Sequence, residues 1–104
     1  MPNSNSLTTT YNILVTGSNG QVGSEIKELS QDYSYNFFFT DRNNIDITSK
    51  DSIKEFCQTN SINVIINCAA YTAVDKAESD EINADLVNRK AVKKLSIVAK
   101  ELNI

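Results

Sequence analysis

The segment ILVTGSNGQVG, residues 13–23, predicts a strand that passes through a tight turn into a helix. Its apolar start is followed at once by Gly17, Gly20 and Gly23, which are the only glycines of the chain. Glycine adopts φ > 0 without a Cβ clash and lets backbone approach a ligand or a neighbouring element closely. The N-terminus of the following helix presents N–H groups and a partial positive charge, which suit a pyrophosphate. The segment therefore predicts a nucleotide-binding turn.

The rest of the chain alternates strand and helix patterns. Apolar runs predict strands over residues 11–16, 36–40 and 62–67, with a further extended piece or very short strand over 44–47. Helical spacing of apolar residues predicts helices over residues 21–29, from 48 or 49 to about 59, and 81–102. Strands that are apolar on both faces are typical of a parallel sheet covered by helices. The sequence thus predicts an α/β fold, the N-terminal part of a Rossmann-like doubly wound parallel sheet with helices on both faces.

The number of predicted strands also bears on domain organisation. A complete dinucleotide-binding domain of this kind has about six strands, and the sequence supplies one half and the first strand beyond the reversal of the sheet. Residues 11–104 are therefore expected to form a truncated Rossmann domain. Residues 1–10 are polar and lack the apolar core of a secretory signal, so we expect a disordered leader.

Composition excludes several classes of function. A formal charge of −3 and 22% charged residues give no electrostatic reason to expect nucleic acid or an anionic membrane. No stretch approaches the roughly 20 apolar residues of a membrane span. Cys57 and Cys68 are too few for a disulfide framework, so we expect buried thiols in a cytoplasmic protein. The chain has no histidine, and we predict no metal site. Its oligomeric state stays open, a homo-oligomer included.

An acidic residue follows the second predicted strand. Asp41 lies near the offset of about twenty residues at which an acid accepts hydrogen bonds from a ribose diol, although aspartate is also common in solvated turns. The adjacent Arg42 can offset the repulsion between that carboxylate and a 2′-phosphate. This pair favours NAD and leaves dual use with NADP open.

Two further segments are candidates for contact with a nucleotide. Asp46 and Ile47 can bring a carboxylate and an aliphatic face to an adenine ring, but an aspartate before a helix is more often a cap or turn residue. Residues 67–72, NCAAYT, follow the third long strand beside the point where ligands bind in such sheets. The alternative for this second segment is that its alanines pack under a helix.

Together these stretches resemble a known family. The glycine turn, DIT at residues 46–48, NCAAYTAVDKAE at residues 67–78, Asn83 and Asn88 are similar to the dTDP-4-dehydrorhamnose reductases, which are extended short-chain dehydrogenase/reductases. The run AAYTAVDKAES, residues 69–79, carries most of this resemblance, because the turn alone indicates only the superfamily. The resemblance implies that NADH or NADPH reduces the 4-keto group of dTDP-4-dehydro-β-L-rhamnose, which gives dTDP-L-rhamnose for surface polysaccharide.

The resemblance also implies roles for single residues. Those that bind the cofactor would be Gly17, Asn19, Gly20, Gln21, Val22, Gly23, Asp41, Arg42, Asp46, Ile47, Ala69, Ala70, Tyr71, Thr72 and Asn88. Among them, Gly20 to Val22 would contact the pyrophosphate, Asp41 the adenosine ribose, and Asp46 with Ile47 the adenine. Asn88 would steady the active site from the last helix. Val74 and Asp75 would lie near the dTDP-sugar substrate.

One family feature is missing from the sequence. The catalytic Tyr-x-x-x-Lys of the superfamily does not occur, since none of the four tyrosines is followed by a lysine four residues later. We therefore predict no catalytic residue, and we expect the chain by itself to be inactive. Two alternatives stay open: a non-catalytic nucleotide-sensing or regulatory module of the same fold, and part of a nucleotide-sugar epimerase or dehydratase.

Overall fold

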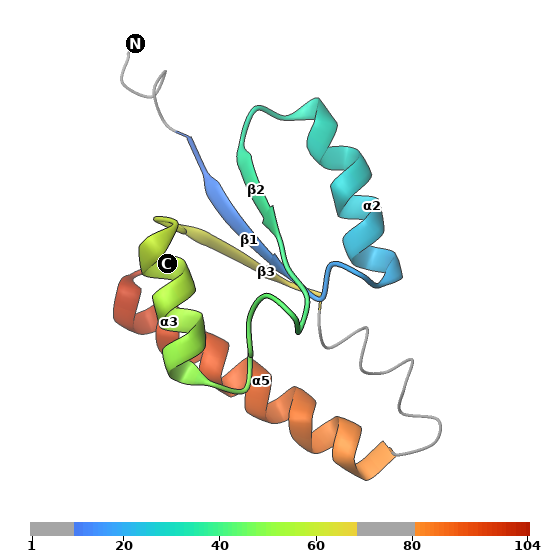
Figure 1. The fold of residues 1–104 in the computed structure, drawn as a ribbon, viewed down its shortest axis with the longest axis vertical. Coiled ribbons are helices and arrows are strands. Elements are labelled where there is room, and N and C mark those ends of the chain that lie inside the picture. Colours follow the sequence, from blue (N-terminus) through green and yellow to red (C-terminus); the bar gives the residue numbers. More distant parts are fainter. Residues whose placement is uncertain (1–9, 69–80) are drawn as a thin grey trace.

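The computed structural model describes the backbone of residues 10–68 and 81–104, and the side chains of residues 10–68 and 89–104. The predicted leader therefore lies, except for its last residue, outside the described residues, as does the segment 69–80. The described elements follow one another as β1 (Asn12–Thr16), α2 (Gln21–Leu29), the 3-10 turn η1 (Ser30–Asp32), β2 (Asn36–Phe39), α3 (Lys50–Thr59), β3 (Val64–Asn67) and α5 (Glu81–Leu102) (Figure 1).

The three described strands form one parallel sheet in the order β2-β1-β3. The central strand β1 pairs with both neighbours, so that Leu14 stands beside Phe38 on one side and Ile65 on the other. Leu14 and Val15 are fully buried. After β2 the chain returns across β1 to place β3 on its far side, which is the reversal that a doubly wound sheet requires. The predicted α/β fold class is confirmed.

Helices cover both faces of this sheet. On the face of α3 and α5, a core forms around the buried residues Leu14, Ile45, Ile53, Cys57, Ile62, Leu95 and Val98. On the face of α2, the buried residues are Ile13, Val15 and Cys68, and half-buried apolar residues pack around them. Leu95 and Val98, two apolar residues of the helix predicted over 81–102, therefore face inward.

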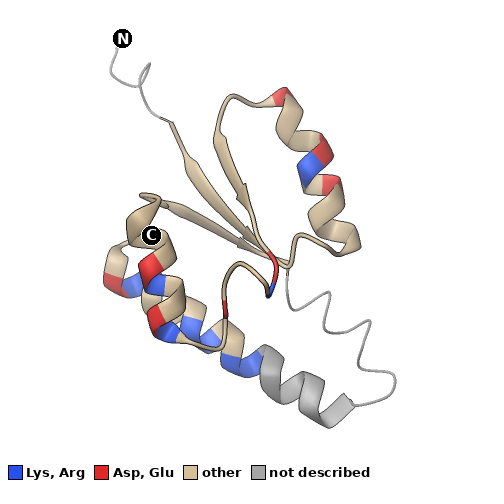
Figure 2. Cartoon of the chain, viewed as in Figure 1, with Lys and Arg blue, Asp and Glu red and all other residues tan. Residues whose placement is uncertain are grey.

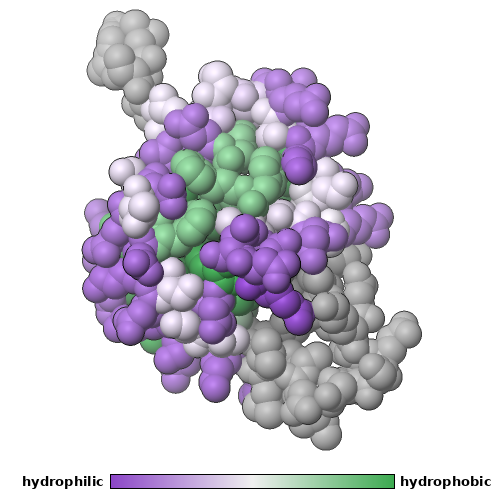
Figure 3. All heavy atoms as spheres, in the orientation of Figure 1, coloured by the Kyte–Doolittle hydropathy of each residue, from purple (hydrophilic) through white to green (hydrophobic). Residues whose placement is uncertain are grey.

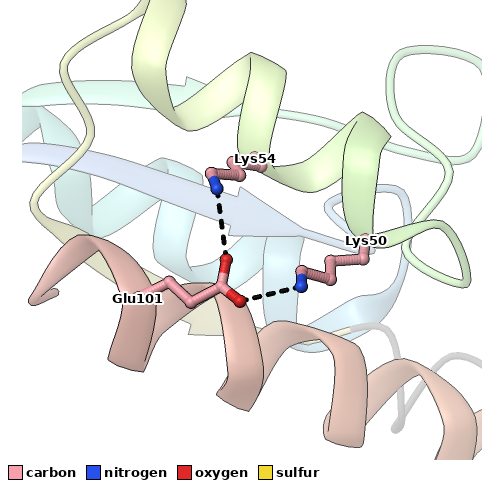
Figure 4. Close-up of polar contacts among 3 residues, drawn as sticks. All are labelled: Lys50, Lys54 and Glu101. Atoms are coloured by element: carbon pink, nitrogen blue, oxygen red, sulfur yellow. Dashed lines mark hydrogen bonds and ion pairs between the residues drawn. The ribbon is translucent and has the colours of Figure 1, made fainter.

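A surface ion pair joins the two helices that share a face. Glu101 of α5 accepts hydrogen bonds from Lys50 at 2.7 Å and from Lys54 at 3.3 Å, both on α3 (Figure 4). These bonds, that from Lys50 first, lower the pKa of the Glu101 carboxyl, and the bond to Glu101 raises the pKa of Lys50. Because all three side chains are exposed, the cluster adds little to stability.

Most predicted boundaries lie within one or two residues of the structure, and two predicted segments differ in a way that the hydrogen bonds explain. The third strand begins at Val64 rather than residue 62, because Ser61 takes a positive φ of 52° and Ile62 donates its N–H to the carbonyl of Cys57 to close α3. Residues 44–47 form no strand. Instead, Asn44 and Ile45 donate their N–H groups back to the carbonyl of Asp41, and the Ile45 side chain enters the core.

Candidate functional site

The predicted glycine turn joins β1 to α2. Gly17, directly after β1, has a φ of 64°, a backbone conformation that glycine adopts without strain. Gly20 donates its N–H to the carbonyl of Gly17 at 3.2 Å and is the N-cap of α2. Asn19, at the tip of the turn, is exposed. The structure thus confirms the turn. Gly17 provides its positive φ, and Gly20 caps the helix.

The third glycine is required by close packing. A Cβ built on Gly23 would lie 2.5 Å from the Cα of Ser18 and 2.7 Å from its carbonyl oxygen. Any side chain at this position would therefore push the first turn of α2 away from the loop. The close approach is to the turn itself rather than to β1.

The N-terminus of α2 presents amides that have no partner in the described part of the chain. No side chain caps this helix, and no acidic residue lies in its first turn. The first N–H of the helix that makes a hydrogen bond within it is that of Ser24, which donates to the carbonyl of Gly20. The N–H groups of Gln21, Val22 and Gly23 have no acceptor among the described residues. Because the N–H of Gly20 is already used within the turn, the amides available to an anion belong to residues 21–23.

Hydrogen bonds tie this turn to the end of β2. Ser18 donates both its N–H and its hydroxyl to the carbonyl of Thr40, each at 2.9 Å. Thr40 in turn donates its N–H and its buried hydroxyl to the carbonyl of Val15, also at 2.9 Å. Sequence reasoning missed both residues. A signal was present, since each is a small hydroxyl residue directly at the carboxyl edge of a predicted strand, where it can bond exposed carbonyls.

Asp41 follows Thr40 at the same edge of the sheet. Its Oδ1 accepts the N–H of Asn43 at 2.8 Å, while its own N–H donates to the Oδ1 of Asn44 at 2.9 Å. This is the turn aspartate of the alternative interpretation, and the predicted contact with a ribose stays a prediction. The second carboxylate oxygen has no partner among the described residues, and the neighbouring Arg42 is exposed and makes no ion pair with them.

Asp46 and Ile47 lie in the loop that leads to α3. The carboxylate of Asp46 accepts the hydroxyl of Thr48 at 2.6 Å and its N–H at 3.0 Å, and these two bonds lower the pKa of the Asp46 carboxyl. Ile47 is half-buried against the core of the α3 and α5 face. Both residues therefore have a structural role in the turn, and the predicted contact with adenine stays a prediction.

The carboxyl end of β3 forms the third part of this edge. Thr16 donates its hydroxyl to the Oδ1 of Asn67 at 2.6 Å, and Cys68 donates its N–H to the carbonyl of Thr16 at 3.0 Å. The predicted residues Ala69, Ala70, Tyr71, Thr72, Val74 and Asp75 lie outside the described residues. Asn88 lies on α5, and its side chain is outside them as well.

The described residues offer little for other chemistry. They contain no group of three or more acidic or cysteine side chains that could hold a metal ion. Cys57 and Cys68 are buried thiols, and burial raises the pKa of each. No helix among the described residues is long and apolar enough to span a bilayer. The site is therefore an edge of backbone amides and small polar side chains, suited to holding an anionic ligand.

Comparison with known proteins assigns the chain that carries this edge to a family. The sequence profile of the RmlD substrate binding domain matches residues 11–104, which include the whole glycine turn and the ends of all three strands. The chain belongs to the RmlD family. The matched segment contains the three glycines, Asp41 and Asp46 together.

Individual relatives support the assignment. The chain is 39% identical over 88 residues to the dTDP-4-dehydrorhamnose reductase of Aggregatibacter actinomycetemcomitans, a match of 84% of this chain and 30% of that protein. It is 38% identical over 90 residues to the dTDP-4-dehydrorhamnose reductase of Burkholderia thailandensis, covering 86% and 30%. The chain thus spans about a third of the length of these RmlD relatives.

Solved structures show the same fold. A dTDP-4-dehydrorhamnose reductase from Clostridium acetobutylicum superimposes with a TM-score of 0.74 at 37% identity, covering 88% of this chain and 32% of that one. The reductase of Bacillus anthracis, solved in complex with NADP, superimposes with a TM-score of 0.78 at 27% identity, covering 92% and 34%. The arrangement of β1, β2 and β3 is therefore that of the RmlD fold.

Proposed function

We propose that residues 11–104 are the N-terminal, cofactor-binding part of a dTDP-4-dehydrorhamnose reductase. Such a protein would be a cytoplasmic oxidoreductase of the short-chain dehydrogenase/reductase type that makes dTDP-L-rhamnose for polysaccharide. One observation carries the proposal: α2 begins with three N–H groups that have no acceptor among the described residues, at the carboxyl edge of the sheet. Membership of the RmlD family and the NADP in the Bacillus anthracis reductase support it.

The described residues fit the adenosine half of NAD or NADP. The amides of residues 21–23, at the positive end of α2, would hold the pyrophosphate. The second carboxylate oxygen of Asp41 would accept a ribose hydroxyl, and Arg42 would offset the charge of a 2′-phosphate. Asp46 and Ile47 would frame the adenine. When bound, the nicotinamide of the cofactor supplies the hydride that reduces the 4-keto group of the sugar.

The remaining roles fall on residues whose side chains lie outside the described part of the chain. Ala69, Ala70, Tyr71 and Thr72 would line the cofactor beyond β3, Asn88 would steady the active site, and Val74 with Asp75 would meet the dTDP-sugar. The sequence contains no Tyr-x-x-x-Lys. We therefore expect no turnover from the 104-residue chain alone.

A chimera tests the proposal. The segment that matches the Aggregatibacter relative over 88 residues would replace its counterpart in that reductase. We expect the chimera to reduce dTDP-4-dehydrorhamnose with NADPH or NADH, and the same chimera with Gly20→Val to lose cofactor binding while its circular dichroism spectrum is unchanged. A chimera that folds and binds neither cofactor would contradict the proposal.

The same chimera tests the role of Asp41. Asp41→Asn keeps an acceptor for the N–H of Asn43 and removes the charge that opposes a 2′-phosphate. We expect the ratio of the two dissociation constants to move towards NADP. A ratio that does not move would show that this carboxylate faces away from the adenosine.

A further inference from the structure

In the part of the chain that the structure describes, the outer edge of β2 has no partner strand. In the doubly wound order 3-2-1-4-5-6, a strand lies outside the second strand. Here the sheet order is β2-β1-β3, and the residues between β2 and α3 form turns instead of a strand. Among the described residues, nothing pairs with the outer side of β2. Figure 3 shows an apolar area over β2, between α2 and α3, bordered by hydrophilic residues.

The backbone of β2 can pair outward. Asn36 donates its N–H to the carbonyl of Tyr11, and Thr40 donates to that of Val15, so these residues and Phe38 between them face β1. The amides and carbonyls of Phe37 and Phe39 therefore face the open edge. Natural edge strands are usually protected by a charge, a proline or a bulge. The sequence of β2, NFFF, has neither charge nor proline, and Figure 2 shows all three strands without charged residues.

Aromatic side chains lie along β2 on the face of the sheet that α2 covers, where Phe37 and Phe39 are partly buried. The ring of Phe37 stacks on that of Phe39 with centroids 5.8 Å apart, and it lies 6.4 Å from Tyr35. Tyr33 stacks on Tyr35 at 5.8 Å, and Tyr11 meets Tyr35 edge-on at 5.1 Å. The three tyrosines are large exposed side chains, between 38% and 57% exposed. We call these five residues the aromatic row.

We propose that this edge is a dimer interface, in which β2 pairs antiparallel with β2 of a second copy about a two-fold axis at Phe37. In that register the outward backbone groups of Phe37 bond those of its own copy, and Phe39 stands opposite Tyr35 of the other chain. Aromatic pairs directly across two strands are stabilising. The aromatic row of one chain thus matches the aromatic row of a second chain. This match favours a second copy over an unrelated strand as the partner of β2.

The charged residues at the two ends of the aromatic row also favour a second copy as the partner. Lys27 of α2 lies 5.7 Å from the centre of the Phe39 ring, at one end of the aromatic row. Asp32, an exposed acid, directly precedes Tyr33 at the other end. An antiparallel two-fold arrangement brings each end of the row towards the opposite end of the second copy, so that each Lys27 approaches an Asp32. The interface therefore matches unlike charges twice.

Sedimentation of the 104-residue chain tests this interface. We expect a concentration-dependent dimer, and we expect Tyr35→Lys, which places a charge on the edge, to raise its dissociation constant by at least about tenfold. Val92→Lys is the matched control, because Val92 is 46% exposed on α5 and does not belong to the row. It should leave the dissociation constant unchanged. A chain that stays monomeric up to about 0.5 mM, or a dimer that Tyr35→Lys does not weaken, would overturn the proposal.

Cross-linking tests the register. In a pair centred on Phe37, the two Cα atoms of residue 37 lie about 5.5 Å apart, within the range that a disulfide spans. Under mild oxidation, Phe37→Cys should form a covalent dimer. Phe38→Cys is the control, because this half-buried side chain points to the α3 face, where its ring meets Phe56. Equal cross-linking of the two variants, or none from Phe37→Cys in a chain that sediments as a dimer, would contradict this register.

Discussion

The helices α2 and α3 begin in opposite ways. At α3, Ser49 is the N-cap, its hydroxyl accepts the N–H of Ser52 at 3.2 Å, and Asp51 adds a negative charge to the first turn. At α2, the N-cap is Gly20, which has no side chain to offer, and the first turn carries no acid. One terminus is satisfied by its own sequence, and the other is left with amides that a ligand can use.

This difference separates stability from binding. A side-chain cap and an acidic first turn stabilise a helix because they satisfy its unpaired N–H groups and its dipole. Leaving both out at α2 gives up that stabilisation where a pyrophosphate would supply the same interactions. Substitutions at α2 should therefore affect binding, or the close packing that binding needs, while substitutions at α3 should affect stability alone.

The largest effect is expected at Gly23. Gly23→Ala places a Cβ within 2.5 Å of the Ser18 backbone, which cannot move aside as a flexible side chain could. We expect a loss of about 3 kcal/mol in the free energy of unfolding, at the upper end of the usual range for overpacking. Urea denaturation measures it, and Ser24→Ala, on the exposed side of the same helix, should change the value by less than about 0.5 kcal/mol. Similar losses in the free energy of unfolding for both variants would contradict the role of Gly23 in close packing.

At Gly20 the expected effect is on binding. Gly20 has an extended backbone, with φ −90° and ψ −178°, so a valine is allowed by the backbone there. Gly20→Val should weaken dinucleotide binding by well over about 1.4 kcal/mol, a factor of ten, because a branched side chain fills space that the pyrophosphate needs. Calorimetry on the reductase chimera gives the number. If affinity is kept while the fold is intact, the turn serves structure only.

A smaller change should follow at the N-terminus of α3. Ser49→Ala removes the hydroxyl that caps the helix and should lower the free energy of unfolding by about 1 kcal/mol. Chemical denaturation is the measurement, with Ser96→Ala on the exposed surface of α5 as control. Cofactor affinity in the chimera should not change. A loss of affinity here would mean that the two termini are not separate in function.

The smallest effect concerns the ion pair between α3 and α5. The hydrogen bonds from Lys50 and Lys54 lower the pKa of the Glu101 carboxyl. The contribution of the ion pair to the free energy of unfolding is therefore present above the ordinary carboxyl pKa and is lost as pH falls through the lowered value. Glu101→Gln should therefore be slightly less stable than the parent at about pH 7, with the difference shrinking at about pH 3. A difference that grows in acid would have the wrong sign for this pair.

The sequence predicted regular structure well where one pattern governs a segment. The bounds of α2 and α5 and the parallel strands followed from apolar spacing and the glycine turn. The sequence predicted element bounds less well where tertiary contacts decide the local structure. Ile62 reads as strand because it is apolar, yet its N–H closes α3 and its side chain enters the core of that face. Local pattern does not distinguish these two uses of an isoleucine.

The site shows the same division. The glycines could be found from spacing, because a positive φ and a close approach leave few other residues possible. Ser18 and Thr40 could not be found in this way, since their roles depend on two strand ends that meet only in the fold. For Asp41, the turn is observed, and the ribose contact stays a prediction for the carboxylate oxygen that does not serve the turn.

Amide chemical shifts of the 104-residue chain test the central claim most directly. NADP would be added to millimolar concentration, and the backbone N–H signals of Gln21, Val22 and Gly23 followed together with those of Lys50, Asp51 and Ser52 at the capped start of α3. The account predicts saturable shifts at the start of α2, weak in affinity, and none at the start of α3. Shifts of equal size at both helix termini, or none at residues 21–23 while other residues respond, would contradict it.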